Sequence, residues 1–265
     1  MGHLKHAKPK EIGIDADRLE TAYRLLRKWT TGPKAPIPGG AILVGRHGRV
    51  VPPRFFGRQG PEPGAEAIRE DGLFLLASIS KPITYLAGML RVEQGQLNLS
   101  DPVARYIPEF AAQHKEDTLV EHLFTHTSGM PDMLADNAEL RRKHAGLKTF
   151  ITGAIGATPL FEPGTDRKYQ SMGTLVVAEL VQRLSGQTIA DFLAGEIFQP
   201  LGLKSSSLGA GTFPRERLVR VEVPDYQIGS DFGWNSPYWQ DLGVPWGGMF
   251  CAPEDLAVIC QWMLN

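Results

Sequence analysis

The sequence predicts an α+β fold, in which a mainly helical region is joined to an antiparallel sheet that looks incomplete. Residues 39–51 read as two short strands around a turn, whereas helical periodicity fills most of the chain after Ile83. Two short strands make only a marginal sheet without partners. We therefore expect one domain over residues 1–265, with an N-terminal helix and strands in 1–76 and a mainly helical region in 77–265.

The N-terminal elements follow from local signals. Apolar residues recur at helical spacing in 14–29, directly after Asp15, a residue type that caps helices well. The hairpin at 39–51 is followed by Pro52 and Pro53, which should interrupt its second strand and place any pairing there at a sheet edge. The glycine-, proline- and charge-rich stretch that follows predicts a loop.

Helical patterns dominate the remaining chain. A helix is predicted from Ile83 to near Gly95, where glycine is a common stop signal. Further helices are predicted over residues 139–155, 173–186, 188–203 and 253–265. Residues 209–247 show little periodicity and predict a long, partly irregular loop region.

Composition narrows the classes of function. With 42% hydrophobic residues and a formal net charge of -1, the chain should form a core, and nothing indicates a nucleic-acid partner. Cys251 and Cys260 lie in one apparently helical stretch and predict unpaired, mostly buried thiols. The N-terminus lacks the apolar region of a signal peptide, and no apolar run is long enough to span a membrane. We therefore expect a soluble cytoplasmic protein.

The stretch SISK contains the first candidate for catalysis. Proline is tolerated only in the first helical turn, so Pro82 places the start of a helix at Ser78 to Ser80. Positions three apart share a helix face, which brings the Lys81 amine within reach of the Ser78 hydroxyl. A lysine so placed can serve as a general base for a serine nucleophile. On this stretch alone, a capping serine followed by a solvated Lys81 is the commoner explanation.

A second candidate lies in the segment DRKYQSMG. Tyr169 and Ser171 fall in a loop just before a strong amphipathic helix. A tyrosine with a short hydroxyl residue two positions on can relay a proton at a serine nucleophile. The alternative is an ordinary buried tyrosine followed by a capping serine.

Two other clusters have weaker claims. His122 and His126 share a helix face, but they lack the His-Glu-x-x-His order of zinc helices, so we expect no metal. Aromatic residues, including Trp234 and Trp246, gather in the irregular region, either as core packing or as the wall of a substrate pocket.

Five stretches of the sequence, taken in order, resemble the serine β-lactamase-related family. They are SISK, LNLSDPVARYIPEF, TLVEHLFTHTSGMPD, FEPGTDRKYQSMGTLVVAELVQRLSG and VPWGGMFCAPEDLAVICQWMLN. That family includes class C β-lactamases, D-alanyl-D-alanine carboxypeptidases and β-lactamase-like esterases, and Ser-x-x-Lys is among its motifs. The resemblance covers residues 37–265 and implies a β-lactamase/DD-peptidase-like fold.

The same resemblance implies roles for individual residues. Ser78 would be the acylated nucleophile, Lys81 its base, and Tyr169 the proton carrier to the leaving group. Ser171 stands where the family more often has asparagine and would bind substrate. Trp246 is a candidate substrate-binding residue on a different ground, as a member of the aromatic cluster that could form an apolar pocket wall. The implied substrate is a small ester or amide, with no metal or organic cofactor.

One family feature is missing from the sequence. A third motif, Lys-Thr-Gly or His-x-Gly, normally follows the stretch resembling PEDLAVICQWMLN and supplies a strand that lines the site. The sequence thus resembles the N-terminal two-thirds of a family member. Because the absent strand normally gives the second oxyanion donor, whose loss costs about 10²–10³ in rate, we expect weak activity. The alternative is a non-catalytic domain that binds a ligand or partner.

Overall fold

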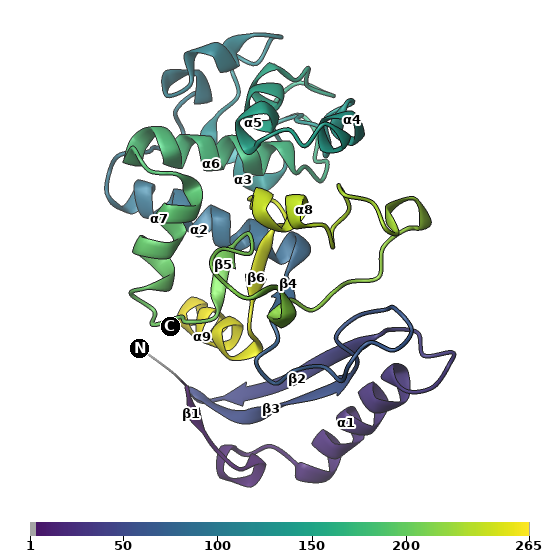
Figure 1. Cartoon of the computed structure of the whole chain (residues 1–265). Helices are drawn as coiled ribbons and strands as arrows, with labels where there is room; N and C mark the ends of the chain where they lie inside the picture. The colour runs from purple at the N-terminus through teal and green to yellow at the C-terminus, as the bar shows by residue number, and fades with distance from the viewer. Residues whose placement is uncertain (1–3, 265) are drawn as a thin grey trace.

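A computed structural model describes residues 4–264 of the chain (Figure 1). Among them, the strands are β1 (Lys5–His6), β2 (Gly39–Arg46), β3 (Arg49–Gly57), β4 (Phe74–Leu75), β5 (Ser206–Leu208) and β6 (Met249–Cys251). The helices are α1 (Ala16–Thr30), α2 (Ser80–Glu93), α3 (Val120–Thr125), α4 (Asn137–Arg142), α5 (Leu147–Gly156), α6 (Met172–Ser185), α7 (Ile189–Leu193), α8 (Pro237–Leu242) and α9 (Pro253–Met263). The predicted α+β class is confirmed.

The N-terminal sheet has the strand order β1-β3-β2 and packs against α1 (Figure 1). Asp15 caps α1 by accepting hydrogen bonds from the backbone amides of Asp17 and Arg18, as the sequence predicts. Tyr23 lies in the cluster between this helix and the sheet, with its ring 5.9 Å from that of Phe56. Burial of this apolar face is what holds α1 on the sheet.

The prediction that Pro52 and Pro53 interrupt the second strand is wrong. Strand β3 runs through both prolines, because the register with β2 shifts between Ile42 and Val44. A bulge leaves residues of one strand unpaired, so prolines that cannot donate a hydrogen bond are accommodated there. On its other side, β3 pairs with β1 only at Arg49 and Val50, before the prolines.

A second sheet, with the order β4-β6-β5, joins three distant segments at the centre of the molecule (Figure 1). Its strands have two or three residues each, too few for an alternating pattern to be visible in the sequence. Cys251 therefore lies in a strand, not in the predicted helix, and burial raises the pKa of its thiol to about 12. Cys260 lies on α9 and is exposed, contrary to the expectation of two buried thiols.

Most predicted helices form, with breaks that the periodicity did not show. The helix predicted over 139–155 is two helices, α4 and α5, separated at His144, whose φ of 51° lies in the left-handed region. The helix predicted over 188–203 starts as α7 and continues as a π-helical turn, Ala194–Phe198. The irregular region 209–247 contains the short helix α8.

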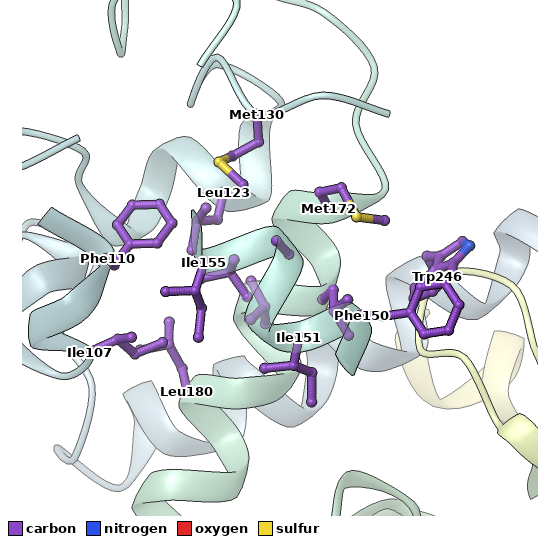
Figure 2. Packing of buried hydrophobic residues seen from close by; sticks show 14 of the residues in the cluster. Ile107, Phe110, Leu123, Met130, Phe150, Ile151, Ile155, Met172, Leu180 and Trp246 are labelled. Carbon is purple, nitrogen blue, oxygen red and sulfur yellow. The ribbon is translucent and has the colours of Figure 1, made fainter. Parts of the chain in front are cut away.

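Helix α6 is the centre of the main core. Met172, Leu175, Val176 and Leu180 are fully buried among residues of α3, α5 and the segment before β6. Figure 2 shows Phe150 and Trp246 at one end of this cluster and Phe110 at the other. Because α6 begins directly after Ser171, its burial fixes the position of the Tyr169–Ser171 segment.

The second edge of β2 pairs with no strand among residues 4–264. A groove of about 580 Å³ lies between β2, β4 and α9, lined by apolar side chains that include Leu43, Leu76 and Leu256. The open edge of β2 agrees with the expectation of a sheet that looks incomplete. Within the described part of the chain, no helix is long and apolar enough to cross a membrane.

Lys115 is a fully buried cation that the sequence does not single out. Its amine donates hydrogen bonds to the carbonyls of Ile155 (2.9 Å) and Ala157 (2.5 Å), at the end of α5, and it lies 4.9 Å from the centre of the Phe110 ring. Burial lowers the pKa of this amine from 10.5 to about 8. The carbonyls satisfy its hydrogen bonds but supply no full counter-charge.

This burial predicts a pH dependence of stability. Between pH 8 and 10.5 the unfolded chain keeps a proton on Lys115 that the folded chain releases, so the free energy of unfolding rises with pH over that window. The gain has an upper bound of roughly 3 kcal/mol. Urea titrations from pH 7 to 10.5 should show this rise in the free energy of unfolding for the wild type but not for Lys115→Met. The control variant Lys148→Met, which replaces an exposed lysine, should show the same rise as the wild type. Parallel pH curves for the wild type and Lys115→Met would contradict the assignment.

Candidate active site

Ser78 lies at the surface on a tight turn, Ala77–Ile79, that leads into α2. The preceding residue, Ala77, has a φ of 46°, a left-handed conformation that is unusual and costly for alanine. Residues with strained backbone cluster at functional sites, so the Ala77 conformation supports a functional role for this turn. Ser78 is therefore presented to solvent by a constrained turn.

Neither serine of the SISK stretch caps the helix. The residue at the N-cap position of α2 is Ile79, with no side-chain cap, while Ser80 is buried and its hydroxyl accepts a hydrogen bond from the Met249 amide at 3.1 Å. Lys81 is only 3% exposed, so it is not a solvated residue of the first turn. The capping interpretation of this stretch is thus contradicted.

The Lys81 amine lies between the nucleophile candidate and a backbone carbonyl. Its Nζ atom is 3.1 Å from the Ser78 hydroxyl and 3.0 Å from the Trp246 carbonyl oxygen, to which it donates. Among residues 4–264, no carboxylate forms an ion pair with this amine. The Ser78 hydroxyl is the side-chain group to which this amine is hydrogen-bonded.

The segment before β6 holds this arrangement together. Thr84 donates a hydrogen bond to the Pro245 carbonyl at 2.9 Å, and the Leu76 amide donates to the Met249 carbonyl at 2.8 Å. The Trp246 side chain is 3% exposed and packs against Phe150, so it belongs to the core. Its role as a substrate-binding residue stays a prediction, while its backbone carbonyl has a clear position beside Lys81.

The Tyr169 ring also contacts the Lys81 amine. The Lys81 amine lies 4.7 Å from the centre of the Tyr169 ring, and half of the tyrosine is exposed. The His126 ring lies 5.0 Å from the same ring. Burial, then the charges of Arg167 and Lys81, lower the pKa of His126, which favours the neutral form of its ring. The structure thus brings Tyr169, which is distant in the sequence, next to the Ser78–Lys81 pair.

Gln170 fixes the backbone that carries Tyr169. Its buried side chain accepts a hydrogen bond from the Ser128 hydroxyl at 2.6 Å and donates to the carbonyl of Leu123 at 3.1 Å. The amide of Lys168 also donates to the His126 carbonyl at 3.0 Å. These bonds join the loop before α6 to the end of α3 and the Ser128–Gly129 segment.

Ser171 is buried, and its hydroxyl is already hydrogen-bonded within the protein. It stands at the N-cap position of α6 and is 1% exposed, but its hydroxyl caps no backbone amide. Instead the hydroxyl donates to the Asp132 carboxylate at 2.6 Å. Its predicted role in substrate binding stays a prediction, and no sequence pattern indicated Asp132 as the partner of this hydroxyl.

The two histidines considered as metal ligands have separate local roles. His122 Nδ1 accepts a hydrogen bond from the Leu119 amide at the start of α3, and the His126 ring packs at a tilt against that of Tyr169. Within residues 4–264, no group of three His, Cys, Asp or Glu side chains is arranged to hold a metal ion.

Comparisons with known proteins place this geometry in context. Esterase EstB of Burkholderia gladioli is 33% identical over 183 residues, which make up 63% of this chain and 46% of the esterase. A β-lactamase of Yersinia enterocolitica is 30% identical over 177 residues, 64% of this chain and 42% of that enzyme. The chain thus spans less than half the length of these two relatives.

Solved structures show the same fold. EstCE1, described as a hydrolase with promiscuous acyltransferase activity, has a TM-score of 0.72 at 22% identity over 92% of this chain and 71% of its own. The β-lactamase family model matches residues 25–265, a range that includes the Ser78 turn, Lys81 and the Tyr169 loop. With this match and the shared fold, the chain belongs to the β-lactamase family.

Proposed function

We propose that the chain is a serine hydrolase that forms an acyl-enzyme at Ser78 on small esters or amides. The observation that carries the proposal is the 3.1 Å contact between the Lys81 amine and an exposed serine on a strained turn. The relatives of the chain are hydrolases that include an esterase and a β-lactamase, which agrees with acyl transfer. Ester, amide and β-lactam carbonyls all suit this chemistry.

In this mechanism the Ser78 oxygen attacks the substrate carbonyl carbon while Lys81 takes the hydroxyl proton. The tetrahedral intermediate then collapses, the bond to the leaving oxygen or nitrogen breaks, and the leaving group receives a proton through Tyr169. Water attacks the resulting ester on Ser78 and releases the acid. The Ser78 backbone amide, at a helix start, is one donor for the oxyanion.

Every step of this cycle uses side chains of the protein and water, so the proposal includes no metal or organic cofactor. We also propose no nucleic-acid or membrane partner, in keeping with the net charge of -1.

The test is covalent labelling of the purified chain with a fluorophosphonate and, separately, with a penicillin, followed by peptide mass spectrometry. We expect an adduct on Ser78 that is lost in Ser78→Ala. Replacement of Ser100, an exposed serine on a distant loop, by Ala should leave the adduct in place. A folded protein that carries no adduct on Ser78 with either reagent would overturn the proposal and favour a non-catalytic binding domain.

A further inference from the structure

Asp132 is held rigidly beside the candidate site. It ends the segment Thr127–Asp132, which is tied to the Tyr169 loop through the bond between Ser128 and Gln170 and through the Met172 amide, which donates to the Pro131 carbonyl at 3.3 Å. The carboxylate itself is exposed, and one of its oxygens, Oδ1, accepts the 2.6 Å hydrogen bond from Ser171. A short bond from a buried hydroxyl fixes the orientation of the carboxylate.

The Ser171 hydroxyl donates to Asp132 and does not cap helix α6. A serine at the N-cap position of a helix normally accepts a hydrogen bond from a backbone amide, a contribution of about 1 kcal/mol in many proteins. At the start of α6 this cap is absent, and the hydroxyl donates to Asp132 instead. The local structure thus favours the oriented carboxylate over the cap.

The charge of Asp132 has no cationic partner within the described residues 4–264. Asp132 lies on the Tyr169 side of the candidate site, because Ser171, which donates to it, follows Tyr169 by two residues. The centre of the Tyr169 ring lies 4.7 Å from the Lys81 amine. Lys81 is buried against Ser78 and Trp246 and therefore does not neutralise the carboxylate. The second oxygen of Asp132 remains able to accept a hydrogen bond from a bound molecule.

We infer that Asp132 selects substrates that carry a protonated amine near the scissile carbonyl, that is, amino esters or amino amides with a free amino group. This inference rests on the proposed acyl transfer at Ser78 and names its substrate class. An ammonium group donates charge-assisted hydrogen bonds to a carboxylate, and these are about twice as strong as bonds between neutral groups. An acetylated amine keeps the amide N–H but loses the charge.

The experiment measures the ratio of kcat/KM for an amino ester to that for its N-acetyl derivative. Methyl esters of α-, β- and γ-amino acids vary the distance between the amine and the carbonyl. We expect the free amine to be preferred by about tenfold or more for at least one of them, as a charged hydrogen bond allows. Asp132→Asn should lower this ratio about tenfold, and Ser171→Ala should lower it less, because the carboxylate stays but loses its orientation.

Asp136→Asn is the matched control, since it removes an exposed carboxylate four residues after Asp132, at the start of α4, and should leave the ratio unchanged. Equal ratios in the wild type and Asp132→Asn would overturn the inference. Hydrolysis of p-nitrophenyl butyrate, a neutral ester, reports on the proposed acyl transfer separately. If no ester is hydrolysed, NMR titration of the amino amides and their N-acetyl forms still tests the binding preference, which Asp132→Asn should abolish.

Discussion

Lys81→Met is expected to slow acylation of Ser78 by about 10²–10⁴, the usual contribution of a positioned general base. Methionine has a similar length and suits a buried position, but it cannot accept a proton. The amine is the group that contacts the Ser78 hydroxyl, at 3.1 Å, so its loss leaves the serine without an activating partner. The rate constant for fluorophosphonate labelling, followed by gel fluorescence, measures the effect directly.

Two controls separate loss of the base from loss of structure. Lys81→Met leaves the Trp246 carbonyl without its donor, which costs about 1–3 kcal/mol if no water replaces it, so the free energy of unfolding has to be measured alongside. Lys168→Met removes an exposed lysine one residue before Tyr169 and should label at the wild-type rate. Wild-type labelling of a folded Lys81→Met protein would show that Lys81 has only a structural role.

The fold could be predicted from the sequence where each element has its own local signal. Asp15, Pro82 and Gly186 mark helix ends, and the structure has α1, α2 and α6 at those places. Strands β5 and β6 have three residues each and are stabilised by their partners and by burial, so no local pattern distinguishes them from loop. Tertiary contacts, not propensity, make them strands.

In the candidate site, too, the contacts between residues close in sequence could be predicted, and the long-range contacts could not. Ser78 and Lys81 share one turn, so their contact follows from helix geometry. The contacts of Tyr169 with Lys81 and His126 join segments that are about 40 to 90 residues apart and depend on how α2, α3 and α6 pack. The bond between Ser171 and Asp132 is equally long-range, and the serine alone resembled an ordinary cap.

Gly129→Ala is expected to cost about 2–5 kcal/mol of unfolding free energy, from a left-handed alanine and from a steric clash together. Gly129 has a φ of +75°, and an added Cβ atom would lie 2.2 Å from the Phe161 carbonyl oxygen. The Gly129 carbonyl also accepts a hydrogen bond from the Leu160 amide at 2.7 Å, so the two backbones cannot separate without losing that bond. Urea unfolding measures the loss.

Gly186→Ala isolates the steric part of this effect. Gly186 has a φ of +70° at the end of α6, but no atom lies within 4 Å of its added Cβ. Its replacement should therefore cost only the left-handed conformation, about 1–2 kcal/mol. The difference in unfolding free energy between the two variants measures the clash, and equal losses would show that the Gly129 backbone can move aside.

Gly129→Ala should also slow labelling of Ser78 under conditions where the protein is still folded, whereas Gly186→Ala should not. The reason is that Gly129 adjoins Ser128, whose hydrogen bond to Gln170 holds the Tyr169 loop.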